Sequence, residues 1–223
     1  MSVPVIAIDG PSASGKGTVA RKLAAALGFH YLESGALYRL VGLASLRAGI
    51  PGDDEARLEA LARGLDLRFQ DGKIFLSQQE VSRDLYEEDC ATRASEVARL
   101  ARVRAALLAR QRAFRRPPGL VADGRDMGTV VFPDASLKVF LTASPQVRAQ
   151  RRYNQLNEKG IHANLHALSR ELEARDARDV ARAVAPLIAA TDAVQLDSST
   201  LSIEEVVSRI LAWWRDRGAR EST

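Results

Sequence analysis

The residues best suited to chemistry stand near the N-terminus, where positions 10–18 read GPSASGKGT. Gly10 and Gly15 let the backbone turn tightly, so that successive N–H groups can point at anionic oxygens. Lys16 adds a mobile positive charge of the kind that stabilises a phosphoryl group in transfer. An apolar run precedes the stretch and a helical pattern follows it, which is the setting of a phosphate-binding loop. The stretch therefore predicts a site for a nucleoside triphosphate. The residues expected to contact that ligand are Gly10, Pro11, Ser12, Ala13, Ser14, Gly15, Lys16, Gly17 and Thr18.

The loop departs in one place from the strict phosphate-loop pattern. Gly17 stands where a serine or threonine usually follows the lysine, and Thr18 comes one residue later. This GKGT form is typical of nucleoside monophosphate kinases. We expect the Thr18 hydroxyl to be a Mg²⁺ ligand, with water and phosphate supplying much of the metal shell. The alternative is a glycine-rich turn that only begins a helix. The strand, the spacing and the lysine together favour the phosphate loop.

A second group of charges, Asp123-Gly124-Arg125-Asp126, separates two apolar runs. Asp123 ends a strand, where a second acidic residue of phosphate-loop enzymes meets Mg²⁺, here expected through water. Arg125 and Asp126 follow at the carboxyl edge of the sheet, where ligands bind in open α/β folds. The alternative is an internal Asp–Arg salt bridge. The shared sheet edge with the phosphate loop favours a ligand site.

Further arginines gather in residues 146–186, a helical region with few large apolar side chains. Arg175, Asp179 and Arg182 are four and three residues apart, so they are expected on one helix face. Arg148, Arg151 and Arg152 come from the preceding helix. These charges either form weak pairs within helices or belong to a lid that closes over phosphates.

The nature of the acceptor is narrowed by charge. An acceptor phosphate is already ionised at neutral pH, so guanidinium groups that hold two polyanions together suffice and no general base is needed. A sugar hydroxyl would require a carboxylate to take its proton. Asp123 or Asp126 could do this, so the spacing alone leaves both kinds of acceptor open.

Two more segments offer candidate acceptor contacts. Ser34, Tyr38 and Arg39 open a predicted helix, with Ser34 in a position to cap it and Tyr38 one turn later. Arg104 lies in an arginine-rich helical run. Taken alone, the first set is also compatible with an ordinary cap, a core aromatic and a surface arginine, and the second with a solvated face.

The elements that must position these residues alternate along the chain. Such alternation predicts an α/β fold of three layers, with a five-stranded parallel sheet covered on both faces. Residues 65–82 break the rhythm with short strands around Asp71-Gly72, a hairpin turn. Ser202 and Glu205 form a capping-box pattern before a final helix whose apolar stripe is expected to face the core. The predicted strands are 3–8, 29–32, 120–122, 137–142 and 193–196, and the first two helices are 16–27 and 35–48.

Composition limits the remaining classes of function. The chain has 223 residues, of which 46% are hydrophobic and 27% charged, as in a globular protein with one large domain or one domain with a small insertion. The single cysteine, Cys90, excludes an internal disulfide framework. His162 and His166 lack the acidic neighbour that metalloprotease chemistry needs. No signal peptide or membrane-spanning run is visible, so we expect a cytoplasmic protein with no membrane partner. The net charge is +4, but acids and bases are mixed and no aromatic stacking platform for nucleic acid is visible.

Six segments, taken in chain order, resemble the bacterial cytidylate kinases over essentially the whole chain. The phosphate loop is shared by many enzymes, whereas DGRDMGT combined with SGALYR is much more specific. The resemblance implies ATP-dependent phosphorylation of CMP and dCMP to the diphosphates by a monomer with Mg²⁺. It divides the chain, a single kinase domain over 1–223, into a nucleoside monophosphate-binding region (35–110, with the β-rich insertion at 65–92) and a lid (148–182). The segments are GPSASGKGT, SGALYR, VRAALLARQRAF, ADGRDMGTVVFPDA, RDARDVARAVAPL and LDSSTLSIEEV.

The resemblance also implies roles for single residues. The cytosine contacts would be Ser95, Arg104 and Asp126, and the acceptor-phosphate contacts Arg39, Arg125 and Arg182. Arg175 and Asp179 would contact the sugar or assist lid closure, while Arg151 and Arg152 would stabilise the transferring charge. Ser34 and Tyr38 complete the acceptor site. The catalytic set is then Lys16, Arg125, Arg151, Arg152 and Arg175.

The sequence departs from the family's pattern at two places. Leu85-Tyr86 stands where the family often has an Ile-Arg pair, and Ala101-Arg102-Val103-Arg104 lacks the usual proline. Two rival functions remain at this point. One is a kinase of the same fold that acts on another small acceptor, such as a sugar. The other is a nucleotide-dependent protein that binds RNA through its arginines.

Overall fold

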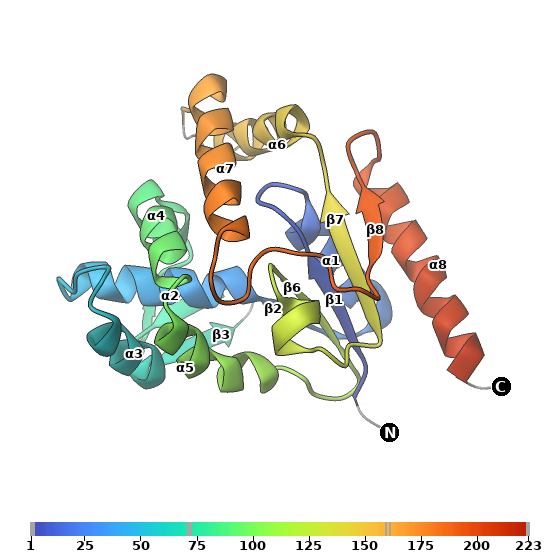
Figure 1. Cartoon of the computed structure of the whole chain (residues 1–223), viewed down its shortest axis with the longest axis horizontal. Helices are drawn as coiled ribbons and strands as arrows, with labels where there is room; N and C mark the ends of the chain where they lie inside the picture. Colours follow the sequence, from blue (N-terminus) through green and yellow to red (C-terminus); the bar gives the residue numbers. More distant parts are fainter. Residues whose placement is uncertain (1–2, 71–72, 159, 161, 222–223) are drawn as a thin grey trace. The chain divides into compact units, whose positions relative to one another are not determined.

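A computed structural model of the chain describes residues 3–70, 73–158, 160 and 162–221. The chain divides into two compact units (Figure 1). The first unit joins the N-terminal stretch up to Leu32 with the chain from Phe114 onward. The second unit is Glu33–Ala113.

The first unit is built on a five-stranded sheet in the order β2-β6-β1-β7-β8. The pairs β1–β6, β1–β7 and β7–β8 are parallel, and Asp9 at the end of β1 stands opposite Gly124 at the end of β6. The chain therefore leaves the sheet toward the phosphate loop and toward Arg125 at the same edge. The predicted α/β fold with a five-stranded parallel sheet is confirmed. The strands are β1 (Val5–Asp9), β2 (His30–Glu33), β6 (Leu120–Gly124), β7 (Leu137–Thr142) and β8 (Val194–Asp197).

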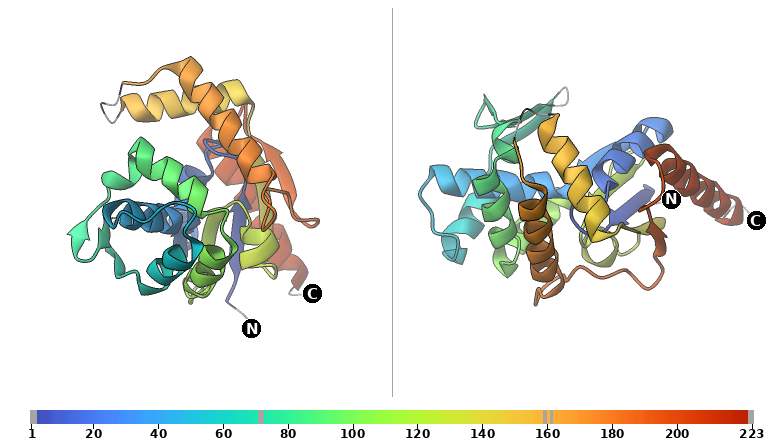
Figure 2. Two further views of the ribbon diagram at one scale, coloured as in Figure 1. Left: turned by 60° about the vertical axis from the view of Figure 1, so that its left-hand side comes forward. Right: turned by 90° about the horizontal axis from the view of Figure 1, so that it is seen from above.

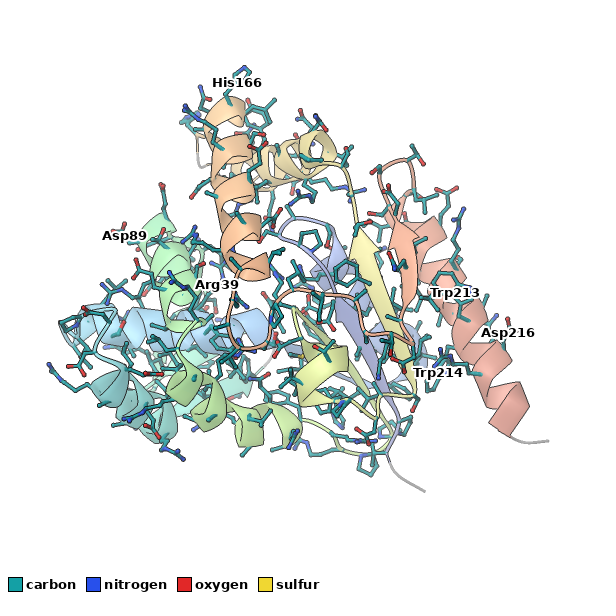
Figure 3. The ribbon with its side chains drawn as sticks, viewed as in Figure 1. Arg39, Asp89, His166, Trp213, Trp214 and Asp216 are labelled. Atoms are coloured by element: carbon teal, nitrogen blue, oxygen red, sulfur yellow. The ribbon has the colours of Figure 1, made fainter. Side chains whose placement is uncertain are left out.

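Helices α1 (Lys16–Leu27) and α8 (Ile203–Glu221) cover one face of this sheet. The apolar side chains of alternate strand positions, such as Ile6, Ile8 and Val139, pack there against both helices. The predicted apolar stripe of α8 is confirmed as core packing. Trp214 ends it, with its ring edge-on to Phe29 at 5.8 Å between centroids (Figure 3).

The ends of these helices follow the sequence signals. Gly28 ends α1 in the left-handed conformation (φ 65°), and its N–H donates to the carbonyls of the last turn. Before α8, the N–H of Ser202 donates to the Glu205 carboxylate at 2.8 Å, and the Ser202 hydroxyl accepts from the N–H of Glu205 at 3.2 Å. The predicted capping box is therefore present.

Three further elements of the first unit lie near the loop edge. Helices α6 (Pro145–Asn157) and α7 (Leu165–Val180) pack against each other, as both views of Figure 2 show. A single π-helical turn, η2 (Met127–Val131), follows β6 and contacts β1. None of the described helices is both long and apolar enough to cross a membrane.

The second unit is mainly helical. Helices α2 and α4 approach closely at Gly42, where an added Cβ would lie 3.0 Å from the backbone nitrogen of Ala94. The predicted β-rich insertion is present as the antiparallel sheet β3-β4-β5, and the Asp71-Gly72 turn lies outside the described residues. The elements are α2 (Ser34–Arg47), α3 (Glu55–Gly64), β3 (Leu67–Gln70), β4 (Lys73–Leu76), β5 (Gln79–Glu80), η1 (Asp84–Tyr86), α4 (Glu88–Val97) and α5 (Ala101–Arg112).

Two expectations about helix ends were wrong. Ser34 is the first residue of α2 and not its cap, because Glu33 holds the N-cap position without a side-chain bond. Helix α7 ends at Val180, so Arg182 lies beyond it and does not share a helix face with Arg175. The Asp179–Arg182 pair nevertheless forms across the helix end.

Candidate active site

The phosphate loop connects β1 to α1, as its sequence predicts. Gly10 cannot carry a side chain, because a Cβ there would lie 2.1 Å from the carbonyl oxygen of Leu141 in β7. Gly15 is the N-cap of α1 with φ 92°, a left-handed conformation that favours glycine. The loop therefore delivers its backbone N–H groups to the N-terminus of α1, where anions are stabilised.

Lys16 lies folded inside this loop. Its Nζ donates to the carbonyl of Pro11 at 2.8 Å, and the residue is buried. Burial, followed by the nearby charge of Arg125, lowers the pKa of Lys16 to about 7, although Asp123 acts in the opposite direction. Arg175 on α7 adds to the lowering, so it lies within electrostatic reach of the lysine. Anionic phosphate oxygens in the loop would offset the same crowding of positive charge.

The neighbours of Gly17 explain the departure from the strict loop pattern. A Cβ at this position would lie 3.2 Å from Oδ2 of Asp123 and 3.6 Å from the hydroxyl of Tyr31. The serine or threonine of the strict pattern would therefore crowd the Asp123 carboxylate. Asp123 is buried at the end of β6 and faces the first turn of α1, while Thr18 is exposed in that turn.

Asp9 is a buried carboxylate that the sequence reasoning missed. Its two oxygens accept from the backbone N–H groups of Met127 and Gly128, both at 2.8 Å, and so hold the start of η2. Burial raises the pKa of Asp9 to about 6, against the effect of these two bonds, and the charge of Asp126 adds to the rise. Asp126, the residue before the held turn, is buried as well. The available signal was a carboxylate at the end of a buried strand.

Arg125 is anchored between the loop and α7. Its guanidinium donates to the Ser12 hydroxyl at 2.7 Å and to the Asp179 carboxylate at 2.8 Å. Arg182 pairs with the other oxygen of Asp179. Burial alone would raise the pKa of Asp179, but Arg125 and Arg182, with Arg175, hold it below the ordinary value. Two of the three arginines predicted for the acceptor phosphate, Arg125 and Arg182, thus share one buried acid beside the phosphate loop.

A second ion pair, between Arg148 and Asp176, contacts the backbone of the same loop residue, Ser12. Arg148 of α6 donates to the carbonyl of Ser12 at 3.2 Å and to that of Ala143 at 3.0 Å. Asp176 of α7 accepts from Arg148 and, at 3.4 Å, from the N–H of Ser12. Asp176 was not among the predicted residues, because its sequence neighbours Arg175 and Asp179 carried the pattern.

Arg151 and Arg152 differ in their surroundings. Arg151 donates to the carbonyl of Ser14 at 3.0 Å and to the carbonyl and hydroxyl of Ser198 at 2.7 Å and 3.0 Å. Ser198, just after β8, also donates to the carbonyl of Thr142 and is buried. Arg151 therefore supports the back of the phosphate loop, and Ser198 is a further residue that no sequence signal revealed. Arg152 donates to Gln155 on the surface of α6.

The candidate acceptor residues of the second unit form two cation–aromatic contacts. The guanidinium carbon of Arg104 lies 5.5 Å from the centre of the Tyr38 ring, and that of Arg39 lies 5.7 Å from the centre of the Tyr86 ring. Arg39, labelled in Figure 3, also donates to the carbonyl of Leu85. The unusual Leu85-Tyr86 pair is therefore the contact surface of Arg39, and such contacts hold a guanidinium without neutralising it.

Ser95 on α4 is buried, with 3% of its surface exposed. Its hydroxyl has no hydrogen-bond partner among the residues that the structure describes. Buried hydroxyls are normally bonded, so an exception indicates a ligand or water. Ser34 is buried at the start of α2.

The structure thus places the predicted residues in two groups. In the first unit, the phosphate loop, Asp123, Arg125, Asp126, Arg175, Asp179 and Arg182 lie around the sheet edge. In the second unit, Tyr38 and Arg104 are in contact and Arg39 lies against η1. His162 and His166 are not part of either group, and His166 stands in the first turn of α7, at the opposite end from Asp176 and Asp179 (Figure 3).

The model of the cytidylate kinase family matches residues 6–216. The chain belongs to this family. A cytidylate kinase of Ralstonia pickettii is 57% identical over 223 residues, which cover 100% of this chain and 96% of that protein. The cytidylate kinase of Bordetella bronchiseptica is 56% identical over 214 residues, covering 96% of both chains. Membership of the cytidylate kinase family confirms the expected resemblance and the expectation of a nucleotide-binding phosphotransferase.

The residues on the donor side of the site are compatible with a Mg²⁺ ion. In the described part of the chain, no group of three or more His, Cys, Asp or Glu residues could hold a metal. Mg²⁺ needs no such group, because it is commonly bound through one or two protein oxygens together with phosphates and water. The carboxylate of Asp123 against Gly17 and the exposed hydroxyl of Thr18 fit that pattern.

Proposed function

We propose that this cytidylate kinase family member transfers the γ-phosphoryl group of ATP to CMP and dCMP, giving ADP and the nucleoside diphosphates. The observation that carries the proposal is the arrangement around Ser12, which joins the phosphate loop to the Arg125–Asp179–Arg182 cluster. A donor loop and a cluster of guanidinium groups at one sheet edge are what two polyanionic substrates require.

ATP is the donor in this reaction, and the residues of the loop bind it. The backbone N–H groups between Gly10 and Thr18 surround its phosphates, and Lys16 leaves the carbonyl of Pro11 to follow the transferring group. Arg151 keeps the loop in shape through Ser14. Thr18, and Asp123 through water, would hold Mg²⁺, which would supply charge neutralisation to the phosphates.

The phosphate of the acceptor binds to guanidinium groups. Arg39, Arg125 and Arg182 are the proposed contacts, and Arg175 with Asp179 serves the sugar or the closing lid. Because the acceptor oxygen is already ionised, no carboxylate has to remove a proton. Arg125 and Arg182 must share their charge with Asp179, so phosphate binding is an exchange of partners and not the filling of an empty cation site.

The base is selected by hydrogen bonds. Asp126 accepts from the exocyclic amino group of cytosine, whereas uracil would present a carbonyl oxygen and repel the carboxylate. Arg104 donates to the ring acceptors from its place over Tyr38. The hydroxyl of Ser95, buried without a partner in the described residues, gains one from the base. Ser34 and Tyr38 complete this side.

The division of labour along the chain is part of the proposal. Residues 35–110, with the β-rich insertion 65–92, bind the nucleoside monophosphate. Residues 148–182 are the lid, whose closure excludes the water that would otherwise accept the phosphoryl group, and Arg152 reaches the transferring charge in the closed state. We further propose that the protein works as a monomer in the cytoplasm, with nucleotides and not nucleic acid or membrane as its partners.

The test is ADP formation from ATP and Mg²⁺ with CMP, dCMP, UMP and AMP measured side by side. We expect CMP and dCMP to give the largest kcat/KM, and UMP to be lower by a factor of about ten or more, as for the loss of one base-specific contact. A sugar or shikimate-like acceptor is included as a further arm. Turnover with that acceptor and none with CMP would overturn the proposal. Salt-sensitive RNA binding without any kinase activity would overturn it as well.

A further inference from the structure

Ser12 is the residue where the charged groups of the first unit converge. Its N–H donates to Asp176, its carbonyl accepts from Arg148, and its hydroxyl accepts from Arg125. These three partners come from α7, α6 and the exit of β6. The side chain of Ser12 is buried, with 6% of the residue exposed. A loop residue that only contacts donor phosphates would not need all of its polar groups bound by protein.

The peptide bond before Ser12 adds a fourth charged partner. Its carbonyl, that of Pro11, accepts from Lys16 at 2.8 Å, and its N–H is the one that donates to Asp176. One peptide unit is thus held by the donor-side lysine on one edge and by α7 on the other. Any group that draws Lys16 away from Pro11 removes one of the two bonds that orient this peptide.

We propose that Ser12 is a positioning residue that couples the two nucleotide sites, because its hydroxyl holds Arg125 for the acceptor phosphate while its peptide responds to the donor. The inference rests on the proposed function, in which Arg125 binds the acceptor. Phosphates in the loop attract Lys16 and bind the loop's N–H groups, which fixes the main chain at Ser12. The hydroxyl then presents Arg125 in one place, so the acceptor phosphate meets an oriented guanidinium.

The coupling must act in both directions. If a bound donor raises the affinity for the acceptor by some factor, a bound acceptor raises the affinity for the donor by the same factor. Asp179 makes the coupling sensitive to Ser12, because it competes for the same guanidinium at 2.8 Å. Without the hydroxyl, Arg125 keeps, among the hydrogen bonds seen in the described residues, those to Asp179 and to the preceding carbonyl, that of Gly124.

The experiment measures CMP binding to the full chain by calorimetry, with and without saturating β,γ-imido ATP and Mg²⁺. The ratio of the two dissociation constants is the coupling factor. We expect at least about fivefold in the wild type, the lower end of usual coupling between sites. Ser12→Ala should bring the factor to within about twofold of one. Binding of β,γ-imido ATP alone is measured in both proteins, so that the donor site is saturated in each when the coupling factor is determined.

Two further variants make the result specific. Asp176→Asn removes the charge that accepts from the Ser12 N–H and should also lower the coupling factor, so the test does not depend on one substitution. Ser144→Ala is the matched control: this serine caps α6 by accepting from the N–H of Val147 at 3.3 Å. It should lower the melting temperature and leave the coupling factor unchanged.

The outcomes separate the inference from the proposed function. A wild-type coupling factor of one, or an unchanged factor in folded Ser12→Ala and Asp176→Asn, overturns the inference while CMP turnover leaves the proposed function intact. Loss of β,γ-imido ATP binding in Ser12→Ala also overturns it, since Ser12 would then serve the donor alone. Absence of any CMP binding or turnover in the wild type overturns the proposed function and the inference together.

Discussion

The two units hold their arginines in different ways. In the first unit, Arg125, Arg148 and Arg182 are each paired with a carboxylate, and the pairs are largely buried. In the second unit, Arg39 and Arg104 lie over tyrosine rings and donate to backbone carbonyls. A paired arginine has part of its charge and some of its N–H donors engaged by the carboxylate. A tyrosine ring, unlike a carboxylate, carries no net negative charge that would neutralise the guanidinium.

The difference matches the two kinds of recognition that the reaction needs. Phosphate groups carry enough charge to displace a carboxylate from a guanidinium, so the arginines of the first unit can be ion-paired before a substrate binds. A neutral base offers single hydrogen bonds, each worth far less. Groups that bind a base are therefore expected to lack strong hydrogen-bond partners before the base binds. The buried hydroxyl of Ser95 lacks such a partner among the described residues.

The largest expected effect comes from removing one of the ion-paired arginines of the first unit. Arg125→Ala removes the guanidinium that joins Ser12 and Asp179, and should cost about 2–5 kcal/mol in kcat/KM for CMP, as for loss of one partner of a buried charge pair. The KM for ATP should change much less. Steady-state kinetics with each substrate varied in turn measure both effects. Equal losses for CMP and ATP would remove Arg125 from the acceptor side.

A matched control for Arg125→Ala is available in the same unit. Arg115 donates to the carbonyl of Val3 at 2.7 Å and pairs with Asp134, and no proposed substrate contact involves it. Arg115→Ala should lower thermal stability and leave kcat/KM for both substrates close to the wild-type values. A fall in CMP turnover as large as that of Arg125→Ala would show that the loss reflects general damage to the unit.

The next prediction concerns the buried carboxylate of Asp9 in the first unit and the pH dependence of the protein's stability. Burial raises the pKa of Asp9 from 3.8 to about 6, so between these values the folded protein binds more protons at this site than the unfolded chain. Stability from this group therefore falls as pH rises from about 4 to about 6. We expect the unfolding free energy of the wild type, minus that of Asp9→Asn, to fall by about 2 kcal/mol between pH 4.5 and pH 7.5.

Denaturant titrations of both proteins across this pH range measure the difference. All other titrating groups are common to the two proteins, so they cancel to first order. Asp9→Asn itself should lose one of the two bonds to Met127 and Gly128, because an amide has only one acceptor oxygen. A difference that stays flat or rises with pH would contradict the raised pKa of Asp9.

Local patterns predicted much of the molecule. The strands β1, β6 and β7, the phosphate loop and the capping box before α8 all depend on neighbours in sequence, which periodicity and spacing reveal. The same holds for the β-rich insertion. The two wrong helix ends, at Ser34 and Arg182, concern boundaries, where local patterns carry the least information.

The partners of the charged residues could not be predicted, because they come from distant parts of the chain. Ser12 and Arg125 are 113 residues apart, and Ser12 and Asp176 are 164 residues apart. The contact between Gly17 and Asp123 depends on the register of two strands and a helix in the same way. Spacing identified which arginines were unusual, and only the fold shows which acid or carbonyl holds each of them. The residues that Asp9, Asp176 and Ser198 contact are likewise distant along the chain.

The smallest expected effect concerns the second unit, where two buried serines can be compared. Ser95 has no hydrogen-bond partner among the described residues, whereas Ser45 donates to the carbonyl of Gly42 at 2.7 Å. Ser45→Ala should lower the unfolding free energy by about 1 kcal/mol and leave CMP affinity unchanged. Ser95→Ala should do the reverse: it should leave stability unchanged or slightly higher, and weaken CMP binding by about 1 kcal/mol, because the hydroxyl is satisfied only when the base is bound.

Calorimetric binding of CMP and denaturant unfolding, measured on both variants, give the two effects separately. The crossed pattern is the informative result, because a general loosening of the unit would move both quantities in both variants. If Ser95→Ala lowers stability as much as Ser45→Ala does and CMP affinity is unchanged, the hydroxyl of Ser95 has an internal role. The contrast between base-binding groups that lack strong partners and phosphate-binding groups that form ion pairs would then apply only to the arginines.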